Sequence, residues 1–300
     1  MRRRIQIGGL AWALLLSGAS GCREAPGTSA ARVATFNIRR FGVEATDLGR
    51  LSSVLLETRA AVVAVQEIER EAPFEALEAA LGRAPGGGRW AHVLSQCGGG
   101  RGMRLGFLYD ASRVALVEAR EYPELDPGGG GRCGEGERPG LLGVFAAPGG
   151  PRVHLVNMHL PAGPEPERVA RRRVQWDRAL AVAAGLRRGG ASRVLVLGDA
   201  NSTGWAQDAQ GERTFIEGAV SDAGLALPSG ALRCTEYWRG APGVLVPSLL
   251  DHVAATPGVV ASARVGGYCA RLACARIAEA DVPEDYRTVS DHCPVVLELR

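Results

Sequence analysis

The decisive stretch of this 300-residue sequence is RVLVLGDANS, at residues 193–202. Its continuous run of Val and Leu is typical of a strand buried on both faces. Gly198 allows a sharp exit from the strand, and Asp199 and Asn201 follow at its end. Side chains two positions apart point to the same side of an extended backbone. The stretch therefore predicts either two functional side chains at the edge of a sheet or an Asx turn in which both bond the backbone.

The surrounding sequence predicts a mixed α/β domain. Apolar runs predict strands at 33–38, 61–67, 105–109, 141–146, 153–159, 249–254 and 294–299, and helical spacing predicts helices at 48–58, 74–81 and 166–186. The turn at 148–151 is typical of a hairpin, whereas other strands alternate with helices. Residues 123–140 are rich in Pro and Gly and predict a long surface loop. We therefore expect one domain over residues 32–300, with mixed sheets covered by helices.

The N-terminal residues are typical of an exported bacterial lipoprotein. Residues 1–21 combine three arginines, an apolar segment and a run of small residues, which indicates a signal peptide rather than a transmembrane helix. The stretch 19–22 (ASGC) resembles a lipobox, in which Cys22 becomes the lipid anchor, and residues 22–31 then form a tether. An ordinary signal peptide cut nearby is the alternative. We expect a protein anchored to a membrane, periplasmic or at the cell surface, or else a secreted one.

The charge of the chain limits the classes of partner that it can bind, and its cysteine content indicates the compartment in which it works. All 35 basic residues are arginines, and three lie in the signal peptide, so the remaining arginines equal the 32 acidic residues in number. A polyanion would therefore meet local arginine clusters rather than a basic field. The arginines of the helix at 166–186 form either such a cluster or a solvated face.

Setting Cys22 aside leaves six cysteines, an even number that favours disulfides in an oxidising compartment. The sequence contains no CxxC spacing, which argues against a zinc site. The pairing that we expect is Cys97–Cys133, Cys269–Cys274 and Cys234–Cys293.

Polar side chains occur at or near the ends of the predicted strands. They are Asn37, Glu67, His159, Asp199, Asn201 and Asp251, and Asp291 with His292 precedes the last strand. If these ends share one rim, carboxylates, amides and histidines meet in a single cleft. Buried charges of this kind need a cation or internal pairing. A donor set rich in oxygen suits Mg²⁺, Mn²⁺ or Ca²⁺ better than zinc.

The motifs around these residues carry a family resemblance. They are TFNI at 35–38, VQE at 65–67, NMHL at 157–160, GDAN at 198–201, LDH at 250–252 and SDHCP at 290–294. In this order they resemble the endonuclease/exonuclease/phosphatase superfamily, which includes DNase I, AP endonucleases, inositol polyphosphate 5-phosphatases and bacterial sphingomyelinases. The similarity extends from about residue 32 to residue 300. It implies a four-layer α/β sandwich, with two mixed β-sheets face to face and helices outside.

The resemblance also implies a metal site and substrate contacts. Glu67 is the expected principal ligand, with Asn37 and Asp291 beside it, and Mg²⁺ is the expected ion, with Mn²⁺ or Ca²⁺ as alternatives. Asn37 also contacts the substrate. Arg104 and Tyr109 are candidate phosphate contacts, and the alternative for them is a charge at a strand edge and a core tyrosine.

The expected catalytic residues are His159, Asp199, Asn201, Asp251 and His292. The resemblance implies that His159 and Asn201 hydrogen-bond the phosphate as it becomes pentacovalent. Asp251 holds His292 in the required tautomer, and Asp199 orients or deprotonates the attacking water. The choice between Asp199 and His292 as the base stays open. A histidine can carry protons near neutral pH, as this chemistry requires.

The other histidines have a structural interpretation. His154 lies five residues before His159, so a regular strand points the two to opposite faces. His92 and His252 stand in no catalytic pattern.

The sequence therefore predicts an exported, metal-dependent phosphodiesterase, a DNase-like nuclease first of all, and a monomer. The alternatives are a sphingomyelinase-like enzyme, a phosphatase of small phosphate esters, and a catalytically inactive binding module on the cell surface. The 5-phosphatase signature is absent, and LDH at 250–252 replaces the LDY pattern of AP endonucleases. No long hydrophobic hairpin of the sphingomyelinase kind is evident in the sequence.

Overall fold

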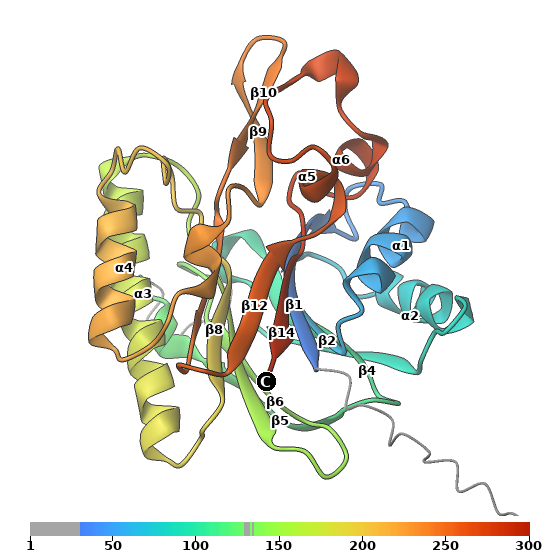
Figure 1. Ribbon diagram of the computed structural model, residues 1–300, viewed down its shortest axis with the longest axis vertical. Helices are drawn as coiled ribbons and strands as arrows, with labels where there is room; N and C mark the ends of the chain where they lie inside the picture. The colour runs from blue at the N-terminus through green and yellow to red at the C-terminus, as the bar shows by residue number, and fades with distance from the viewer. Residues whose placement is uncertain (1–30, 129–132, 134) are drawn as a thin grey trace, which may run out of the picture.

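Two mixed β-sheets form the centre of the molecule in the computed structural model, which describes residues 31–128, 133 and 135–300 (Figure 1). The predicted signal peptide (1–21), Cys22 and all but the last residue of the tether (22–31) lie outside the described residues.

One sheet has six strands. Their order is β12 (Val260–Val265), β14 (Val295–Leu299), β1 (Arg32–Phe41), β2 (Val62–Ile68), β4 (Arg104–Asp110) and β3 (Trp90–Leu94). Strands β1 and β2 are parallel, and the other neighbours are antiparallel.

The second sheet has five strands. Their order is β11 (Asp251–Ala255), β8 (Val194–Asp199), β7 (Arg152–His159), β6 (Gly140–Ala146) and β5 (Ala115–Tyr122). Strands β7 and β8 are parallel, and the other pairs are antiparallel. The predicted hairpin at 148–151 is confirmed, because β6 and β7 pair across it.

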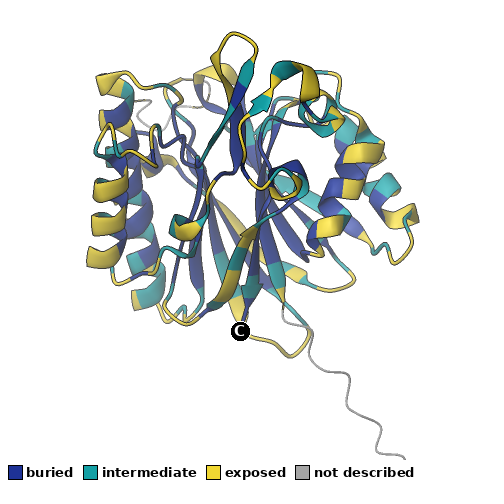
Figure 2. Ribbon diagram, turned by 45° about the horizontal axis from the view of Figure 1, so that its top comes forward, coloured by how far each residue is buried: buried dark blue, intermediate teal, exposed yellow. Residues whose placement is uncertain are grey.

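Three apolar layers hold the sandwich together. Between the sheets, one buried cluster takes side chains from both, and Phe107 of β4 meets Phe145 of β6 with ring centroids 5.4 Å apart. Helices α1 (Leu48–Thr58) and α2 (Pro73–Arg83) cover the outer face of the six-stranded sheet. Helices α3 (Pro166–Arg188) and α4 (Glu212–Asp222) cover the five-stranded sheet (Figures 1 and 2). The predicted four-layer sandwich is confirmed.

The strands of each parallel pair end on the same rim of the sandwich. Below this rim, Gln66 of β2 donates a hydrogen bond from Nε2 to Asn157 Oδ1 of β7 at 2.8 Å, and both side chains are fully buried. Asn157 in turn donates to the carbonyl oxygens of Val65 and Gly106. Because buried polar groups are costly when unpaired, this network fixes the two sheets relative to each other just beneath the rim.

Gly198 is required where β8 approaches β7. Its φ of +142° lies in a region that L side chains rarely adopt, and an added Cβ would lie 1.9 Å from the carbonyl oxygen of Met158. The glycine therefore lets the end of β8 stay paired with β7 while the chain turns outward.

A small third sheet, which the sequence did not predict, stands above the rim. Its order is β13 (Ile277–Ala278), β10 (Val244–Ser248) and β9 (Glu236–Ala241), and β9 and β10 form a hairpin at the top of the molecule (Figure 1). Short helices α5 (Gly267–Arg271) and α6 (Glu284–Thr288) lie beside it. The 3₁₀ helices are η1 (Gly99–Arg101), η2 (Pro123–Leu125), η3 (Pro228–Ala231) and η4 (Glu279–Asp281).

The disulfide bonds of the structure differ from two of the three predicted pairings. Cys97–Cys133 forms as predicted, but the other two bonds are Cys234–Cys274 and Cys269–Cys293. The prediction that Cys269 pairs with Cys274 and Cys234 with Cys293 is therefore wrong. These four cysteines lie in one buried cluster beneath the third sheet, and α5 directs Cys269 toward the chain before β14. Sequence separation alone could not show this choice.

Three disulfides suggest an oxidising environment outside the cytoplasm. Among the helices in the described part of the chain, none has the length and apolar content needed to cross a bilayer.

Candidate active site

Most of the predicted site residues meet at the rim where the parallel strands end. Glu67, His159, Asp199, Asn201, Asp291 and His292 all line one cavity of about 410 Å³. Asn37 is buried at the end of the same strand set and bonds two of these side chains. Asp251 lies behind His292 at the start of β11, where it pairs with Asp199 of β8.

Asn37 joins the two sheets at the floor of this cavity. Its Nδ2 donates to Asp199 Oδ2 at 2.9 Å and to Glu67 Oε1 at 3.2 Å. Its Oδ1 accepts from the backbone N–H of Arg39 at 3.0 Å. The amide is thereby fixed in one orientation between two carboxylates.

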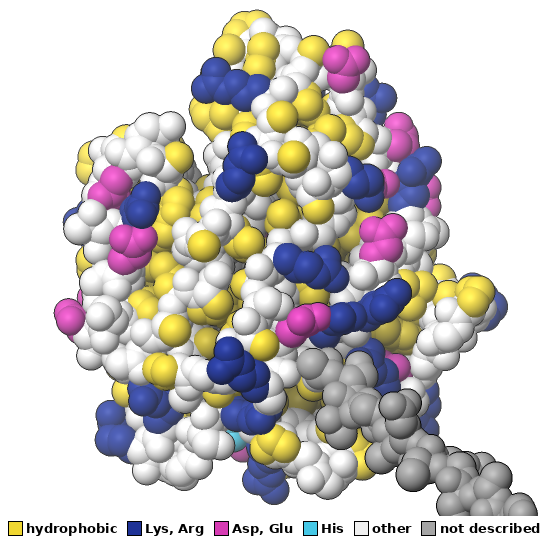
Figure 3. All heavy atoms as spheres, in the orientation of Figure 1, with side chains coloured by type: hydrophobic (Ala, Val, Ile, Leu, Met, Phe, Trp, Pro, Cys, Tyr) yellow, Lys and Arg dark blue, Asp and Glu magenta, His cyan; other side chains and the backbone are white. Residues whose placement is uncertain are grey.

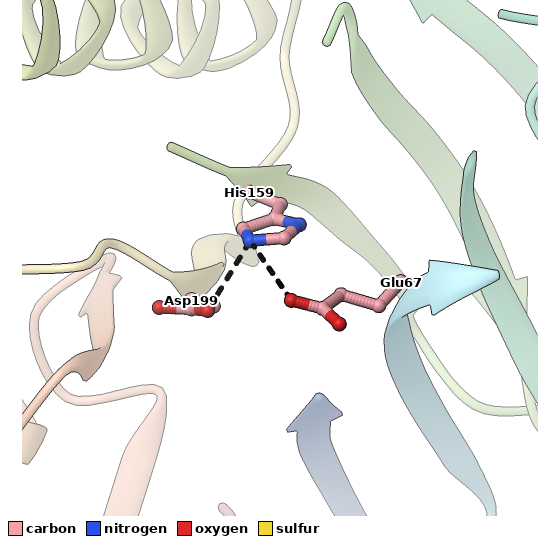
Figure 4. Close-up of side chains that lie close together, drawn as sticks. All are labelled: Glu67, His159 and Asp199. Carbon is pink, nitrogen blue, oxygen red and sulfur yellow. Dashed lines mark ion pairs between the residues drawn. The ribbon is translucent and has the colours of Figure 1, made fainter. Parts of the chain in front are cut away.

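His159 faces the same two carboxylates (Figure 4). Its Nε2 lies 3.3 Å from Asp199 Oδ2 and 3.7 Å from Glu67 Oε1. Its Nδ1 is buried and has no hydrogen-bond partner among the described residues. Burial holds the pKa of His159 well below its usual value, and the charges of Arg138 and His292 act in the same direction.

Asp251 and His292 form a buried pair. His292 Nδ1 and Asp251 Oδ2 are 2.9 Å apart, and His292 Nε2 lies 3.7 Å from Asp199 Oδ2. Burial lowers the pKa of His292, but the charges of Asp251 and Asp199 outweigh it and raise the pKa well above the ordinary value. The pKa values of the two histidines of the cavity, His159 and His292, are therefore shifted in opposite directions.

Asp199 stands between the two histidines. Burial raises the pKa of this carboxyl to about 7, the charges of Asp251 and Glu67 add to the rise, and His292 and Asn37 oppose it. Its Oδ1 accepts the backbone N–H of Asn201 at 2.9 Å. The Asx turn that the sequence left as an alternative is thus present, together with the placement of Asp199 in the cavity.

Two of these residues have a left-handed backbone conformation. Glu67 has a φ of +63° and Asn201 a φ of +49°. Such a conformation is uncommon for residues other than glycine, and it clusters at functional sites. It changes the prediction for 199–201, because the chain is not extended there, and Asn201 instead donates from Nδ2 to the carbonyl of Leu160 at 2.9 Å.

Sequence reasoning missed Glu236 and Arg138. Glu236 opens β9, lines the cavity and is buried, and burial raises the pKa of its carboxyl well above the usual value. Arg138 lines the cavity from the loop that precedes β6. The sequence held no signal for Glu236, because the hairpin that positions it was not predicted. Arg138 lies in the stretch that was expected to be a surface loop.

The structure does not bring Arg104 and Tyr109 to the cavity. Arg104 donates to Glu71 at 3.2 Å, and Tyr109 packs its ring on Phe145 at the opposite end of β4. Neither residue lines the cavity. The antiparallel pairing of β4 with β2 places Tyr109 far from the rim, whereas Arg104 starts β4 near the rim but bonds Glu71 instead of lining the cavity.

The remaining histidines have structural surroundings, as expected. His92 contacts Glu78 at 2.6 Å and stacks on Phe74. His252 is fully buried, with Nε2 2.7 Å from Ser202 Oγ and its ring 4.2 Å from that of Trp205. Burial lowers the pKa of His252 to about 3. His154 lies on β7 away from the catalytic cavity and lines a separate surface hollow.

A family model matches residues 34–292 of the chain, and its description is Endonuclease/Exonuclease/phosphatase family. The chain belongs to the endonuclease/exonuclease/phosphatase family. It is accordingly a phosphoric ester hydrolase of a family in which dependence on a divalent metal is typical. No curated protein matches the sequence.

Solved structures agree on the fold of this family. The endonuclease/exonuclease/phosphatase from Bacteroides vulgatus has 18% identity and a TM-score of 0.61, and the match covers 90% of this chain and 98% of that one. TDP2 from D. rerio, complexed with a single-strand DNA product, has 15% identity and a TM-score of 0.60, covering 91% and 99%. The mannosyl-6-phosphatase from Bacteroides thetaiotaomicron has 16% identity and a TM-score of 0.59, covering 90% and 99%.

The side chains present fit a hard divalent cation of the kind this family uses. Two overlapping groups, Glu67 with His159 and Asp199, and Asp199 with Asp251 and His292, have ligand atoms within 4.8 Å of one another. Buried oxygens of Asp251 (Oδ1) and Glu236 (Oε2) have no hydrogen-bond partner in the described part of the chain. A buried set dominated by carboxylate oxygens favours Mg²⁺, Mn²⁺ or Ca²⁺. The six cysteines outside the N-terminal segment are in disulfides and offer no thiolate.

Proposed function

We propose that the protein is an exported nuclease that hydrolyses phosphodiester bonds with the help of Mg²⁺. The observation that carries the proposal is the convergence of four carboxylates, two amides and two histidines with oppositely shifted pKa values on one buried rim. This arrangement fills the roles that phosphate-ester hydrolysis needs. A catalytically inactive binding module would have no use for it.

The proposed metal ligands are Glu67, Asn37 and Asp291. An ion held there would supply positive charge to the phosphate oxygens. The Glu67 carboxylate is oriented toward such a site by hydrogen bonds from Asn37 Nδ2 and from the backbone N–H of Arg40 at 3.0 Å.

The chain's own groups would orient the substrate and move its protons. His159, kept neutral by burial, and Asn201 would donate hydrogen bonds to the phosphate as its charge builds up. Asp199 would orient or deprotonate the attacking water. His292, held by Asp251 at 2.9 Å, would stabilise charge and exchange protons beside it.

A second hollow beside the active site favours a nucleotide substrate over a small phosphate ester. It has a volume of about 880 Å³ and shares Asn201, Glu236 and Leu250 with the catalytic cavity. Trp205 and Trp238 line it. Tryptophan rings provide stacking surfaces for bases, and each stacked base contributes about 1–3 kcal/mol.

The main alternative is a phosphatase of small phosphate esters, because one of the structural neighbours is a mannosyl-6-phosphatase. A sphingomyelinase-like activity is a further alternative. The hairpin of β9 and β10 exposes about half of Trp238. Apolar side chains are visible at the top of Figure 3, where this hairpin stands.

The test is a panel assay with purified protein and Mg²⁺ or Mn²⁺. Substrates are DNA, RNA, sphingomyelin, a sugar phosphate and bis-p-nitrophenyl phosphate, and Asp199→Asn serves as the inactive control. We expect hydrolysis of nucleic acid and of the model diester. Cleavage of lipid alone, or of the sugar phosphate alone, would reject the nuclease assignment, and activity retained in Asp199→Asn would reject the site.

We also propose that residues 1–21 direct export and that Cys22 carries a lipid. The tether over residues 22–31 would then link this anchor to a monomeric domain over residues 32–300. Mass spectrometry of the mature N-terminus tests the lipid. A Cys22→Ala variant should move from the membrane fraction to the soluble fraction, and sedimentation of the released domain tests the monomer.

A further inference from the structure

Four arginines line one side of the catalytic cavity. They come from three segments, the loop before β4, the loop before β6 and the start of α3, and we call them the arginine subsite: Arg101, Arg138, Arg168 and Arg171. The proposed catalytic roles use none of them. Their number is notable in a chain whose formal net charge is only +3, because it concentrates positive charge at one place.

Arg138 is the buried member of the arginine subsite, with only 8% of its surface exposed. Its Nη1 donates to the carbonyl of His159 at 3.3 Å and its Nη2 contacts Met103 Sδ at 3.7 Å. Its Nε has no partner among the residues that the structure describes. A guanidinium has five N–H donors, so this cation is buried with much of its hydrogen-bonding capacity unused.

Carboxylates of the protein do not account for this charge. Within the described chain, Arg138 and Arg171 have ion pairs only with Glu137, at 3.7 Å and 3.2 Å, and share it. Among the described residues, Arg138 makes no hydrogen bond to Glu67 or Asp199, although their negative charges favour its protonated form. A role as countercharge to the acidic centre would explain Arg138 alone, but not the three arginines beside it.

The loops that hold the arginine subsite are fixed covalently and by hydrogen bonds. The disulfide Cys97–Cys133 links the two loops, and Gly100 N donates to Gly136 O at 3.0 Å. The loops of Arg101 and Arg138 are therefore held together before a ligand arrives, and α3 carries the other two arginines, which reduces the entropy cost of binding.

We propose that the arginine subsite binds a second phosphate group of the substrate, next to the phosphate that is hydrolysed. Arginine forks match phosphate oxygens in charge and geometry, and such bonds are strong where water is partly excluded. The substrate class is a phosphodiester that carries another phosphate close by, as in a nucleic acid chain or a nucleotide with a terminal phosphate. A phosphodiester with a cationic head group would be repelled there. This inference rests on the proposed function.

A binding experiment separates the subsite from catalysis. Thymidine 3′,5′-bisphosphate and the two thymidine monophosphates are titrated calorimetrically into the protein with Mg²⁺, and each ligand is checked for integrity afterwards. We expect the bisphosphate to bind at least about tenfold more tightly than either monophosphate. Equal affinities for the three ligands would overturn the proposal.

Variants test whether the arginine subsite causes the tighter binding of the bisphosphate. Arg101→Gln with Arg168→Gln removes two exposed or half-exposed arginines of the subsite, and Arg83→Gln with Arg188→Gln removes two exposed arginines elsewhere as the matched control. We expect the first double variant to abolish the preference for the bisphosphate and the control to retain it. Arg138→Gln should act likewise if its unfolding midpoint shows that it folds. Retention of the preference in the first variant would contradict the proposal.

Activity measurements then distinguish this proposal from the proposed function. Wild-type protein should cleave the dinucleotide dTpdT faster when it carries a 5′- or a 3′-phosphate, by about tenfold in kcat/KM and mainly through KM. If no dinucleotide is cleaved while the calorimetric preference holds, the nuclease proposal fails and the subsite stands. If dinucleotides are cleaved without any such preference, the subsite fails and the nuclease proposal stands.

Discussion

The two sides of the cleft differ in chemistry although they adjoin the same catalytic centre. One side is the arginine subsite, which presents charge. The other is the hollow lined by Trp205 and Trp238, which we call the tryptophan hollow and which presents mainly apolar surface. A substrate that satisfies both has a further phosphate on one side of the scissile bond and a flat ring on the other. Nucleotides have this combination, whereas a sugar phosphate or a choline lipid lacks at least one part of it.

The two sides share a principle of construction. Each includes segments outside the two large sheets, and a disulfide holds part of each in place. Cys97–Cys133 fixes the loops of the arginine subsite, and Cys234–Cys274 holds the base of the β9–β10 hairpin that carries Trp238. If the two sides select the substrate as we propose, the disulfides have a functional as well as a stabilising role.

Replacing Asp199, in the catalytic centre that both sides of the cleft adjoin, should have the largest effect on activity. Asp199→Asn keeps the shape of the side chain but removes the buried carboxylate between His159 and His292. We expect kcat to fall by about 10³-fold or more on every substrate, because water activation is lost whichever side holds the substrate. Binding of thymidine 3′,5′-bisphosphate should persist. A loss confined to one substrate class would contradict a shared centre.

We expect a smaller loss of kcat when Asp251, which holds His292, is replaced. Asp251→Asn should lower kcat by about 10²-fold, because the imidazole loses its orienting acceptor. Asp251 also raises the pKa of His292, so this pKa falls in the variant, and the limb of the pH–rate profile that reports His292 should move to lower pH. Asp222→Asn, at the exposed end of α4, is the matched control. An unchanged profile would argue against the pair.

The tryptophan hollow should show a selective effect. Trp238→Ala removes a half-exposed ring, so the fold should persist. We expect KM to rise about 5- to 30-fold for thymidine 5′-p-nitrophenyl phosphate and to change little for methyl p-nitrophenyl phosphate, which has no base to stack. Trp238→Phe should restore most of the difference. Equal rises for both substrates would remove the contrast between the two sides.

We expect the smallest effect on activity when His252, behind the tryptophan hollow, is replaced. Its replacement should instead change how stability depends on pH. The pKa of His252 is about 3 in the folded protein and near 6.5 in an unfolded chain, so between these values the unfolded chain binds more protons. Its contribution to stability is therefore present above about pH 6.5 and is lost as pH falls, by at most about 1.4 kcal/mol per pH unit.

Asp199, whose pKa is raised to about 7, acts in the opposite direction over part of this range, so the comparison must be between variants. Urea unfolding from pH 4 to pH 7 should show a shallower loss of stability in acid for His252→Gln than for the wild-type chain. Parallel curves would show that His252 is not buried in its neutral form.

Much of the sandwich could be predicted because its central strands are continuous apolar runs. The strand of residues 193–202 was predicted from such a run, and β8 is buried at every position. Edge strands were missed for the opposite reason. In β5 and β12 most residues are exposed or half-exposed, so the apolar pattern that marks a strand is weak.

The candidate catalytic residues could be found in the sequence because each lies within a short motif at or beside the end of a strand. His159, Asp199 and His292 do meet in one cavity. Tyr109 lies outside the cavity because only the start of β4 reaches the rim, and Arg104, at that start, bonds Glu71 instead. The disulfide pairing, Glu236 and the arginine subsite depend on loops that meet only in the folded chain.

The sequence by itself determined the central strands and the motifs that deliver acids, amides and histidines to a rim, because local apolar pattern and chain order encode them, and its family resemblance implied the four layers. Only the tertiary structure decided how the loops join above that rim. It placed a buried arginine on one side and a tryptophan hairpin on the other, and it paired Cys234 with Cys274 and Cys269 with Cys293. The physical reason is that these contacts link segments far apart in the chain, and no local periodicity records such distances.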